Sequence, residues 1–165
     1  MEKNLPIRKR NRLQWYDYGS AGMYFLTACT LERKALFWDN VGATIGRPQE
    51  IALSEYGKIV EEAILRIPQI YPSVFLENYV IMPNHIHLLI SVYQTEGGRP
   101  VVAPTIPRVV KQLKGVVSKA VGFSIWQKSY YDHVIRNEQD YEEHMRYIEE
   151  NPLKWELDKL YTNDE

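Results

Sequence analysis

Two histidines separated by one apolar residue, His85 and His87, begin a hydrophobic run in the segment Met82-Pro83-Asn84-His85-Ile86-His87-Leu88-Leu89-Ile90. Because side chains alternate across a β-strand, both imidazoles would point to one face and the apolar side chains to the other. Two imidazoles on a rigid strand can bind one divalent ion. A single histidine in such a run is more often a half-buried residue with one hydrogen bond, so the metal site needs support elsewhere in the chain.

A second group of polar residues lies in the last expected helix. Its members recur at spacings of three and four: Asp140, His144, Tyr147 and Asn151. Taken alone, Tyr147 is an amphipathic residue with a buried ring and a wet hydroxyl. Asn151 precedes Pro152, which disfavours helical geometry, so we expect the helix to end there. The terminal Asn151 amide would then be able to reach a metal ion.

Hydrophobic periodicity predicts the elements that must position these residues. Strands are expected at 23–30, 74–81, 85–93 and 126–135, and helices from an N-cap at Ser54 to about 67, at 107–121 and at 138–150. The order is β-α-β-β-α-β followed by one helix, which predicts an α+β, ferredoxin-like antiparallel sheet with two helices on one face. The additional C-terminal helix, which carries Tyr147, has room on the open face.

Composition indicates one soluble domain. The chain has 165 residues, 45% of them hydrophobic, which is enough for a sizeable core. We divide it into a basic arm (1–18), a core (about 19–152) and an acidic tail (153–165). It lacks a long apolar run and a signal peptide, so we expect a cytoplasmic protein that does not bind membranes. The one cysteine, Cys29, is most simply a small core residue.

Charge is segregated along the chain although the net charge is only -1. Residues 97–131 contain no acidic side chain, and residues 138–165 are strongly acidic. The expected helix at 107–121 would bury one stripe and expose basic residues opposite. Its expected buried residues are Val109, Leu113, Val116, Val117 and Ala120. A charge run is usually a solvated face, but basic residues beside aromatic ones also suit contact with single-stranded nucleic acid.

Three segments together resemble the REP-associated tyrosine transposases, relatives of the single-tyrosine HUH transposases of the insertion-sequence-200 type. The segments are the His85–His87 pair, Trp126 to Arg136, and Tyr147 to Pro152. The resemblance extends from about Tyr18 to Asn151.

This resemblance implies a transposase that cleaves and rejoins single-stranded DNA through a 5′-phosphotyrosine intermediate. His85 and His87 match the HUH pair that would bind Mg²⁺ or Mn²⁺, and Tyr147 matches the nucleophile. Asn151 stands at the position of a third amide ligand, where the insertion-sequence relatives commonly have glutamine. His133 fits the family pattern, with a supporting hydrogen bond or phosphate contact.

The resemblance also implies the DNA partner, namely REP-like palindromic hairpins recognised by shape and by a short tetranucleotide beside the stem. Candidate phosphate contacts are Arg8, Lys9, Arg10 and Arg12 in the arm and Lys111, Lys114 and Lys119 in the basic helix. Trp126, Tyr130 and Tyr131 either stack bases or belong to the core. A monomer is expected rather than a dimer.

Two alternatives remain open from the sequence. In the first, a metal-bound water replaces Tyr147 as the nucleophile, which makes the protein a phosphodiesterase. In the second, the protein is a domesticated hairpin-binding module that no longer cuts DNA.

Overall fold

The computed structural model describes residues 22–39, 51–93, 106–158 and 160. Its centre is a four-stranded sheet in the order β2-β3-β1-β4, in which every neighbouring pair is antiparallel. The strands are β1 (Gly22–Cys29), β2 (Val74–Ile81), β3 (His85–Val92) and β4 (Tyr131–Val134). This confirms the predicted α+β, ferredoxin-like sheet, including the β2–β3 hairpin.

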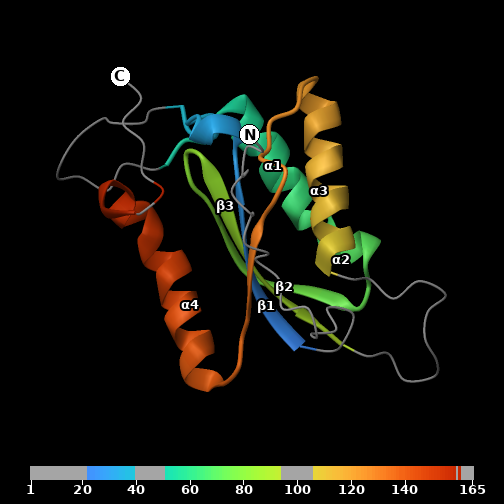
Figure 1. The fold of residues 1–165 in the computed structure, drawn as a ribbon, viewed down its shortest axis with the longest axis vertical. Helices are drawn as coiled ribbons and strands as arrows, with labels where there is room; N and C mark the ends of the chain where they lie inside the picture. The colour runs from blue at the N-terminus through green and yellow to red at the C-terminus, as the bar shows by residue number, and fades with distance from the viewer. Residues whose placement is uncertain (1–21, 40–50, 94–105, 159, 161–165) are drawn as a thin grey trace, which may run out of the picture.

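Helices cover both faces of this sheet. They are α1 (Glu55–Leu65), α2 (Ile67–Ile70), α3 (Ile106–Val121) and α4 (Glu138–Glu150), with 3₁₀ segments η1 (Leu31–Arg33) and η2 (Asn151–Leu157). Figure 1 shows α1 and α3 together on one side of the sheet and α4 on the other. The extra helix therefore lies on the open face, as expected. No helix in the described ranges is long and apolar enough to cross a membrane.

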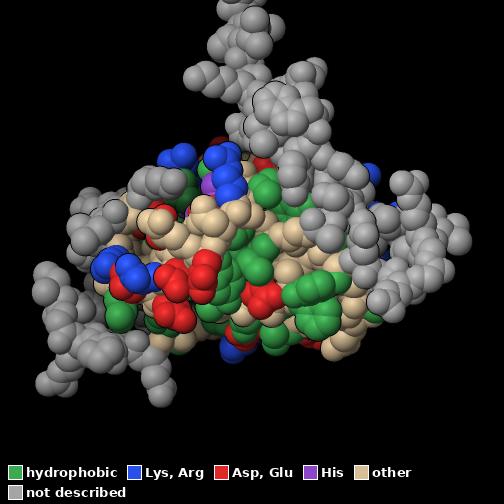
Figure 2. Space-filling model, turned by 90° about the horizontal axis from the view of Figure 1, so that it is seen from below, with side chains coloured by type: hydrophobic (Ala, Val, Ile, Leu, Met, Phe, Trp, Pro, Cys, Tyr) green, Lys and Arg blue, Asp and Glu red, His purple; other side chains and the backbone are tan. Residues whose placement is uncertain are grey.

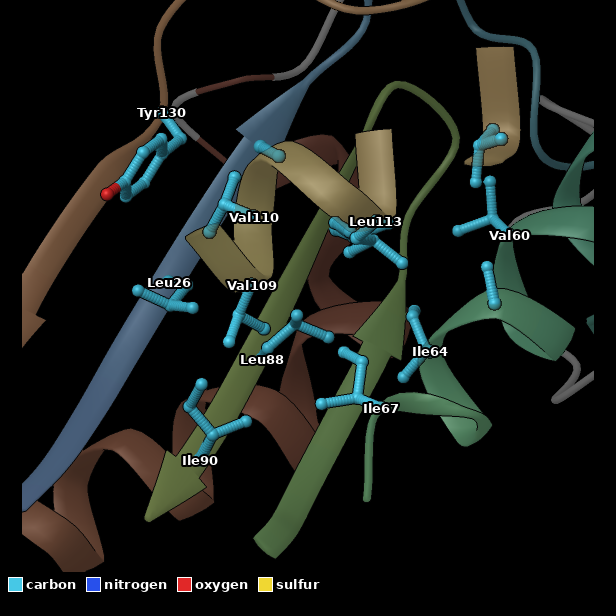
Figure 3. Packing of buried hydrophobic residues seen from close by; sticks show 14 of the residues in the cluster. Leu26, Val60, Ile64, Ile67, Leu88, Ile90, Val109, Val110, Leu113 and Tyr130 are labelled. Atoms are coloured by element: carbon cyan, nitrogen blue, oxygen red, sulfur yellow. The ribbon is translucent and has the colours of Figure 1, made fainter. Parts of the chain in front are cut away.

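Strand β3 is buried along its whole length because both faces of the sheet are covered. Ile86, Leu88 and Ile90 belong to the larger core, which α1 and α3 complete. Figure 3 shows Leu88 and Ile90 beneath the helical side chains of this cluster. On the opposite face, Leu89 packs with Phe25 and Ile148 of α4. The alternation read from the sequence is therefore the division between two cores, with the histidines on the α4 face.

The start of α1 agrees with the sequence more closely than its end. The Ser54 Oγ accepts a hydrogen bond from the Gly57 amide at 3.1 Å, which confirms the N-cap of α1. The helix was expected to continue to about residue 67 and stop at Pro68. It ends at Leu65, and Pro68 lies instead in the first turn of α2, where a missing amide proton is tolerated.

Two expectations for the second half of the chain are corrected. The buried residues of α3 are Ile106, Val109, Val110, Leu113 and Val117, whereas Val116 and Ala120 are exposed. The buried residues of α3 therefore lie nearer to the start of the helix than expected. The expected strand at 126–135 is ordered as β4 only at Tyr131–Val134, with Trp126 in an isolated bridge to Thr30.

Lys114 explains the shorter strand. Its ammonium group donates hydrogen bonds to the backbone carbonyls of Gln127 and Ser129 at 2.8 and 2.9 Å. Because the Gln127 and Ser129 carbonyls are directed to Lys114, the residues between Trp126 and β4 form a loop beside the sheet.

The approach of α1 to Phe37 yields a stability prediction. A Cβ at Gly57 would lie 2.2 Å from the Phe37 carbonyl oxygen, whereas one at Gly115 would meet nothing within 4 Å. We expect Gly57→Ala to lower the free energy of unfolding by about 1–3 kcal/mol. Gly115→Ala is the matched control and should raise it by up to about 1 kcal/mol, because alanine favours helix. Urea unfolding checks both, and equal effects of the two variants would contradict the close approach.

Candidate functional site

The strand register brings the histidine pair together with β1 on the face covered by α4. His87 lies opposite Thr27, and His85 lies opposite Cys29. Their imidazoles are buried, and the two Nε2 atoms are 3.1 Å apart. The structure therefore places the two predicted ligands on one face with their ring nitrogens converging.

Hydrogen bonds hold both rings in this orientation. The Asn84 amide nitrogen donates to the carbonyls of Leu160 at 2.8 Å and Arg33 at 3.2 Å, which directs the Asn84 oxygen to His85. That oxygen accepts from His85 Nδ1 at 2.7 Å, so the proton of neutral His85 is on Nδ1 and Nε2 has a lone pair. The Nδ1 of His87 is 2.7 Å from the Thr27 hydroxyl. Such outer contacts orient histidine ligands for a metal ion.

Tyr147 lies beside the pair on α4. Its ring centroid is 5.2 Å from that of His87 and 6.0 Å from that of Phe25. The residue is 37% exposed, so its ring is packed while solvent reaches part of it. Burial raises the pKa of the Tyr147 hydroxyl, the Asp158 carboxylate raises it further, and Asn151 acts in the opposite sense. At neutral pH the phenol is therefore protonated and needs help to act as a nucleophile.

A cavity of ≈ 250 Å³ opens next to Tyr147 and His87. Its walls come from β1, β3, the start of β4 with the loop before it, α4 and the turn after η2. The lining residues are Phe25, Thr27, Cys29, His87, Gln127, Ser129, Tyr130, Tyr131, Tyr147 and Leu160. Tyr130 and Trp126 are buried, as the core interpretation predicted, whereas Tyr131 is half exposed. The Lys114 hydrogen bonds hold two wall residues, Gln127 and Ser129, in place.

Segment η2 continues directly from α4 and brings two more polar side chains to the site. Helix α4 ends at Glu150 with the buried Asn151 as its C-cap, which confirms the expected end, and the chain continues as a 3₁₀ helix with Pro152 in its first turn. Asp158 follows η2, and its Oδ2 is 3.6 Å from His85 Nε2. Trp155 and Asp158 of the expected acidic tail therefore lie against His85.

Sequence reasoning missed Asp158, because it sits among acidic residues that were assigned to a solvated surface. The pattern carries no signal for it, since no fixed spacing relates it to the histidines. Only the return of the chain past the β2–β3 hairpin brings it there.

The donor set fits a divalent ion. His85, His87 and Asp158 each offer an atom, and these atoms all lie within 4.8 Å of one another. The Asp158 Oδ2 is buried and accepts no hydrogen bond from the described residues, which leaves it available to a cation. Imidazole, carboxylate and amide donors together are a common environment for divalent metals.

A second group of titratable residues, His133, Asp140 and His144, also has metal-ligand spacing. Here the Asp140 carboxylate accepts hydrogen bonds from His133 Nε2 at 3.0 and 2.8 Å, and His144 Nδ1 donates to the Asp140 carbonyl at 2.8 Å. Burial opposes ionisation of Asp140, but these contacts and the Arg136 amide outweigh it and lower its pKa. The groups satisfy one another, so this cluster serves to anchor the start of α4.

The predicted basic contacts lie apart from the histidines. Lys111 and Lys119 are exposed on α3, which covers the other face of the sheet, and Lys114 is directed toward the loop carbonyls. Figure 2 shows acidic and basic side chains beside each other on the described part of the face seen from below. The four arm residues from Arg8 to Arg12 lie outside the described residues.

Comparisons with known proteins place the chain. No family model matches it. An uncharacterized protein of Haemophilus influenzae is 33% identical over 175 residues, or 94% of each chain. A second protein of that species, whose name contains "REP-associated tyrosine transposase", is 23% identical over 84% of this chain and 74% of its own length. The REP-associated tyrosine transposase of Escherichia coli is 26% identical over 66% of this chain and 61% of its own. This chain is related to the REP-associated tyrosine transposases.

A solved structure extends the likeness to the fold. The REP-associated tyrosine transposase bound to a REP hairpin superimposes with a TM-score of 0.62 at 23% identity, and covers 87% of this chain and 72% of that one. The chain thus shares the fold of that structure.

Metal binding distinguishes the two histidine clusters. We expect the wild-type protein to bind one Mn²⁺ beside the tyrosine. His87→Ala should weaken binding at least about tenfold, since even outer contacts of metal ligands are worth that much. His144→Ala is the matched control and should bind as the wild type does, because His144 is already engaged with Asp140. Titration followed by electron paramagnetic resonance measures this, and the reverse ranking would move the metal site to the second cluster.

Proposed function

We propose that this protein is a tyrosine-dependent endonuclease and strand transferase that acts on single-stranded REP-type hairpin DNA. The observation that carries this proposal is the packing of Tyr147 against His87 in the wall of one cavity, beside converging histidine nitrogens. A tyrosine and a divalent-metal donor set at one opening suit attack on a phosphodiester.

The proposed step is a transesterification at phosphorus. The Tyr147 oxygen forms a bond to phosphorus, and the bond from phosphorus to the 3′ oxygen of the neighbouring nucleotide breaks. The phenolic proton is lost and the departing 3′ oxygen gains one. The product is a 5′-phosphotyrosine with a free 3′-hydroxyl, and attack by another 3′-hydroxyl rejoins the strand. No nucleotide cofactor is needed, because each phosphodiester is exchanged for another.

His85, His87 and Asn151 would hold the divalent ion. When bound, Mg²⁺ or Mn²⁺ supplies positive charge to the scissile phosphate and orients it for in-line attack. The protein supplies the rest. Burial raises the pKa of the Tyr147 phenol, and packing against Phe25 and His87 limits the orientations of its ring.

Tyr147 and the histidines lie together within one chain, which supports a monomer that uses its own tyrosine. A dimer with exchanged tyrosines would need α4 to leave the sheet. Such a movement would expose Ile148, Phe25 and Leu89, which form the smaller core.

A covalent adduct tests the function directly. An oligonucleotide with a REP-type hairpin, labelled at its 3′ end, should become attached to the wild-type protein with Mg²⁺ or Mn²⁺ and stay free with chelator. Tyr147→Phe should abolish the adduct. Tyr141→Phe is the matched control, because Tyr141 lies on the same helix but does not line the cavity. Denaturing protein gels measure the label.

The other outcomes identify the alternatives. Cleavage without an adduct would assign a metal-dependent phosphodiesterase that uses water. Hairpin binding without cleavage under any metal would assign a domesticated binding module. Mixing Tyr147→Phe with His87→Ala should not restore the adduct, whereas restoration would show that tyrosines act across subunits.

The basic residues make a separate prediction about affinity. Replacing Arg8, Lys9, Arg10 and Arg12 by glutamine should weaken hairpin binding. It should also reduce the slope of log K against log salt by about 0.7 for each phosphate that the arm no longer neutralises. The matched variant carries Lys111→Gln and Lys119→Gln, which change the exposed side of α3. Fluorescence anisotropy over a salt series compares them, and an unchanged slope in the arm variant would show that the arm does not bind the DNA.

A further inference from the structure

The turn after η2 sets a carboxylate against the histidine pair. The side chains of Asp158 and His85 are both fully buried, with Oδ2 and Nε2 3.6 Å apart. The other carboxylate oxygen, Oδ1, accepts a hydrogen bond from the Leu160 amide at 2.8 Å. Oδ2 accepts none from the described residues. Because a buried carboxylate oxygen without a donor is costly, this arrangement calls for a positive partner.

The position of the proton on neutral His85 also indicates a positive partner at this place. The Asn84 oxygen accepts a hydrogen bond from the Nδ1–H group of His85, so the lone pair of the neutral ring is on Nε2, which faces Asp158. His87 Nε2 is close to the same place, 3.1 Å from His85 Nε2. The two Nε2 atoms and the Asp158 Oδ2 therefore converge on one place. One divalent ion satisfies all three at once.

Asp158 is held in this position by the same loop that orients His85. The side-chain oxygen of Asn84 accepts a hydrogen bond from His85 Nδ1, and its side-chain nitrogen donates one to the Leu160 carbonyl at 2.8 Å. The Asp158 amide donates to the Trp155 carbonyl at 3.0 Å, and the Trp155 ring centroid is 5.9 Å from that of His85. The carboxylate therefore sits on an anchored turn and needs little ordering to bind an ion.

We propose that Asp158 is a carboxylate ligand of the divalent ion held by His85 and His87, and that it shifts the site's preference from zinc toward Mg²⁺ and Mn²⁺. The inference rests on the proposed metal-dependent function. Imidazoles alone favour zinc, nickel and copper, whereas carboxylate oxygen suits the harder ions. A carboxylate ligand from Asp158 would thus favour Mg²⁺ and Mn²⁺ at a site that also has two imidazoles.

Metal affinity in the full chain without DNA tests the ligand role. Asp158→Asn keeps the size of the side chain and removes its charge, and we expect at least about tenfold weaker Mn²⁺ binding. Zn²⁺ binding should fall by a smaller factor. Glu149→Gln removes the same charge from an exposed position on α4 and should change neither affinity. Calorimetric titrations with MnCl₂ and ZnCl₂ give both constants.

A direct readout does not depend on any variant. Wild-type protein labelled with ¹³C at its aspartate carboxyl groups should show a ¹³C hyperfine coupling to bound Mn²⁺ in pulsed electron paramagnetic resonance. Absence of that coupling in a protein that binds one Mn²⁺ would overturn the proposal. An Mn²⁺ affinity that is unchanged or higher in folded Asp158→Asn would also overturn the proposal. Asp158 would then only shield the histidines from solvent.

The failure of the wider function has a different signature. If His87→Ala also leaves Mn²⁺ affinity unchanged, the histidine metal site itself fails. If His87→Ala weakens binding and Asp158→Asn does not, only the carboxylate ligand is overturned and the histidine site stands.

Discussion

The burial of β3 on both faces is the constraint on which the site depends. Its alternating side chains must satisfy two different surroundings, an apolar layer under α1 and α3 and a mixed layer under α4. Ile86 and Leu88 meet the first requirement. His85 and His87 meet the second, because imidazoles enclosed on a central strand keep a fixed separation that a surface loop would not give.

Buried imidazoles must be hydrogen-bonded, and their partners link distant parts of the chain. Thr27 on β1 faces His87, and Asn84 in the hairpin loop faces His85. Asn84 also donates a hydrogen bond to the Leu160 carbonyl and so holds the turn after η2. One amide thus connects the orientation of a histidine to the position of the chain beyond α4, which brings Asp158 to the same site. Satisfying buried polar groups is what assembles the site.

Local patterns predicted the elements well where the residues of one element decide them. The alternation in 74–92 indicated the hairpin, Ser54 indicated the start of α1, and the polar residues at the start of α4 suited its positive end. The failures occurred where a tertiary contact overrides local preference. Lys114 removes loop carbonyls from the fourth strand, and the position of α3 on the sheet turns Val116 to solvent.

The sequence by itself determined the fold class, the shared face of His85 and His87, and the presence of Tyr147 at the margin of an amphipathic helix, because these follow from side-chain periodicity within single elements. The tertiary structure decided which of these residues meet. It set Tyr147 against His87 through the packing of α4 on Phe25 and Leu89, and it brought Asp158 to His85. No periodicity can encode such contacts, because they depend on how separate elements dock and on which buried polar groups must find partners.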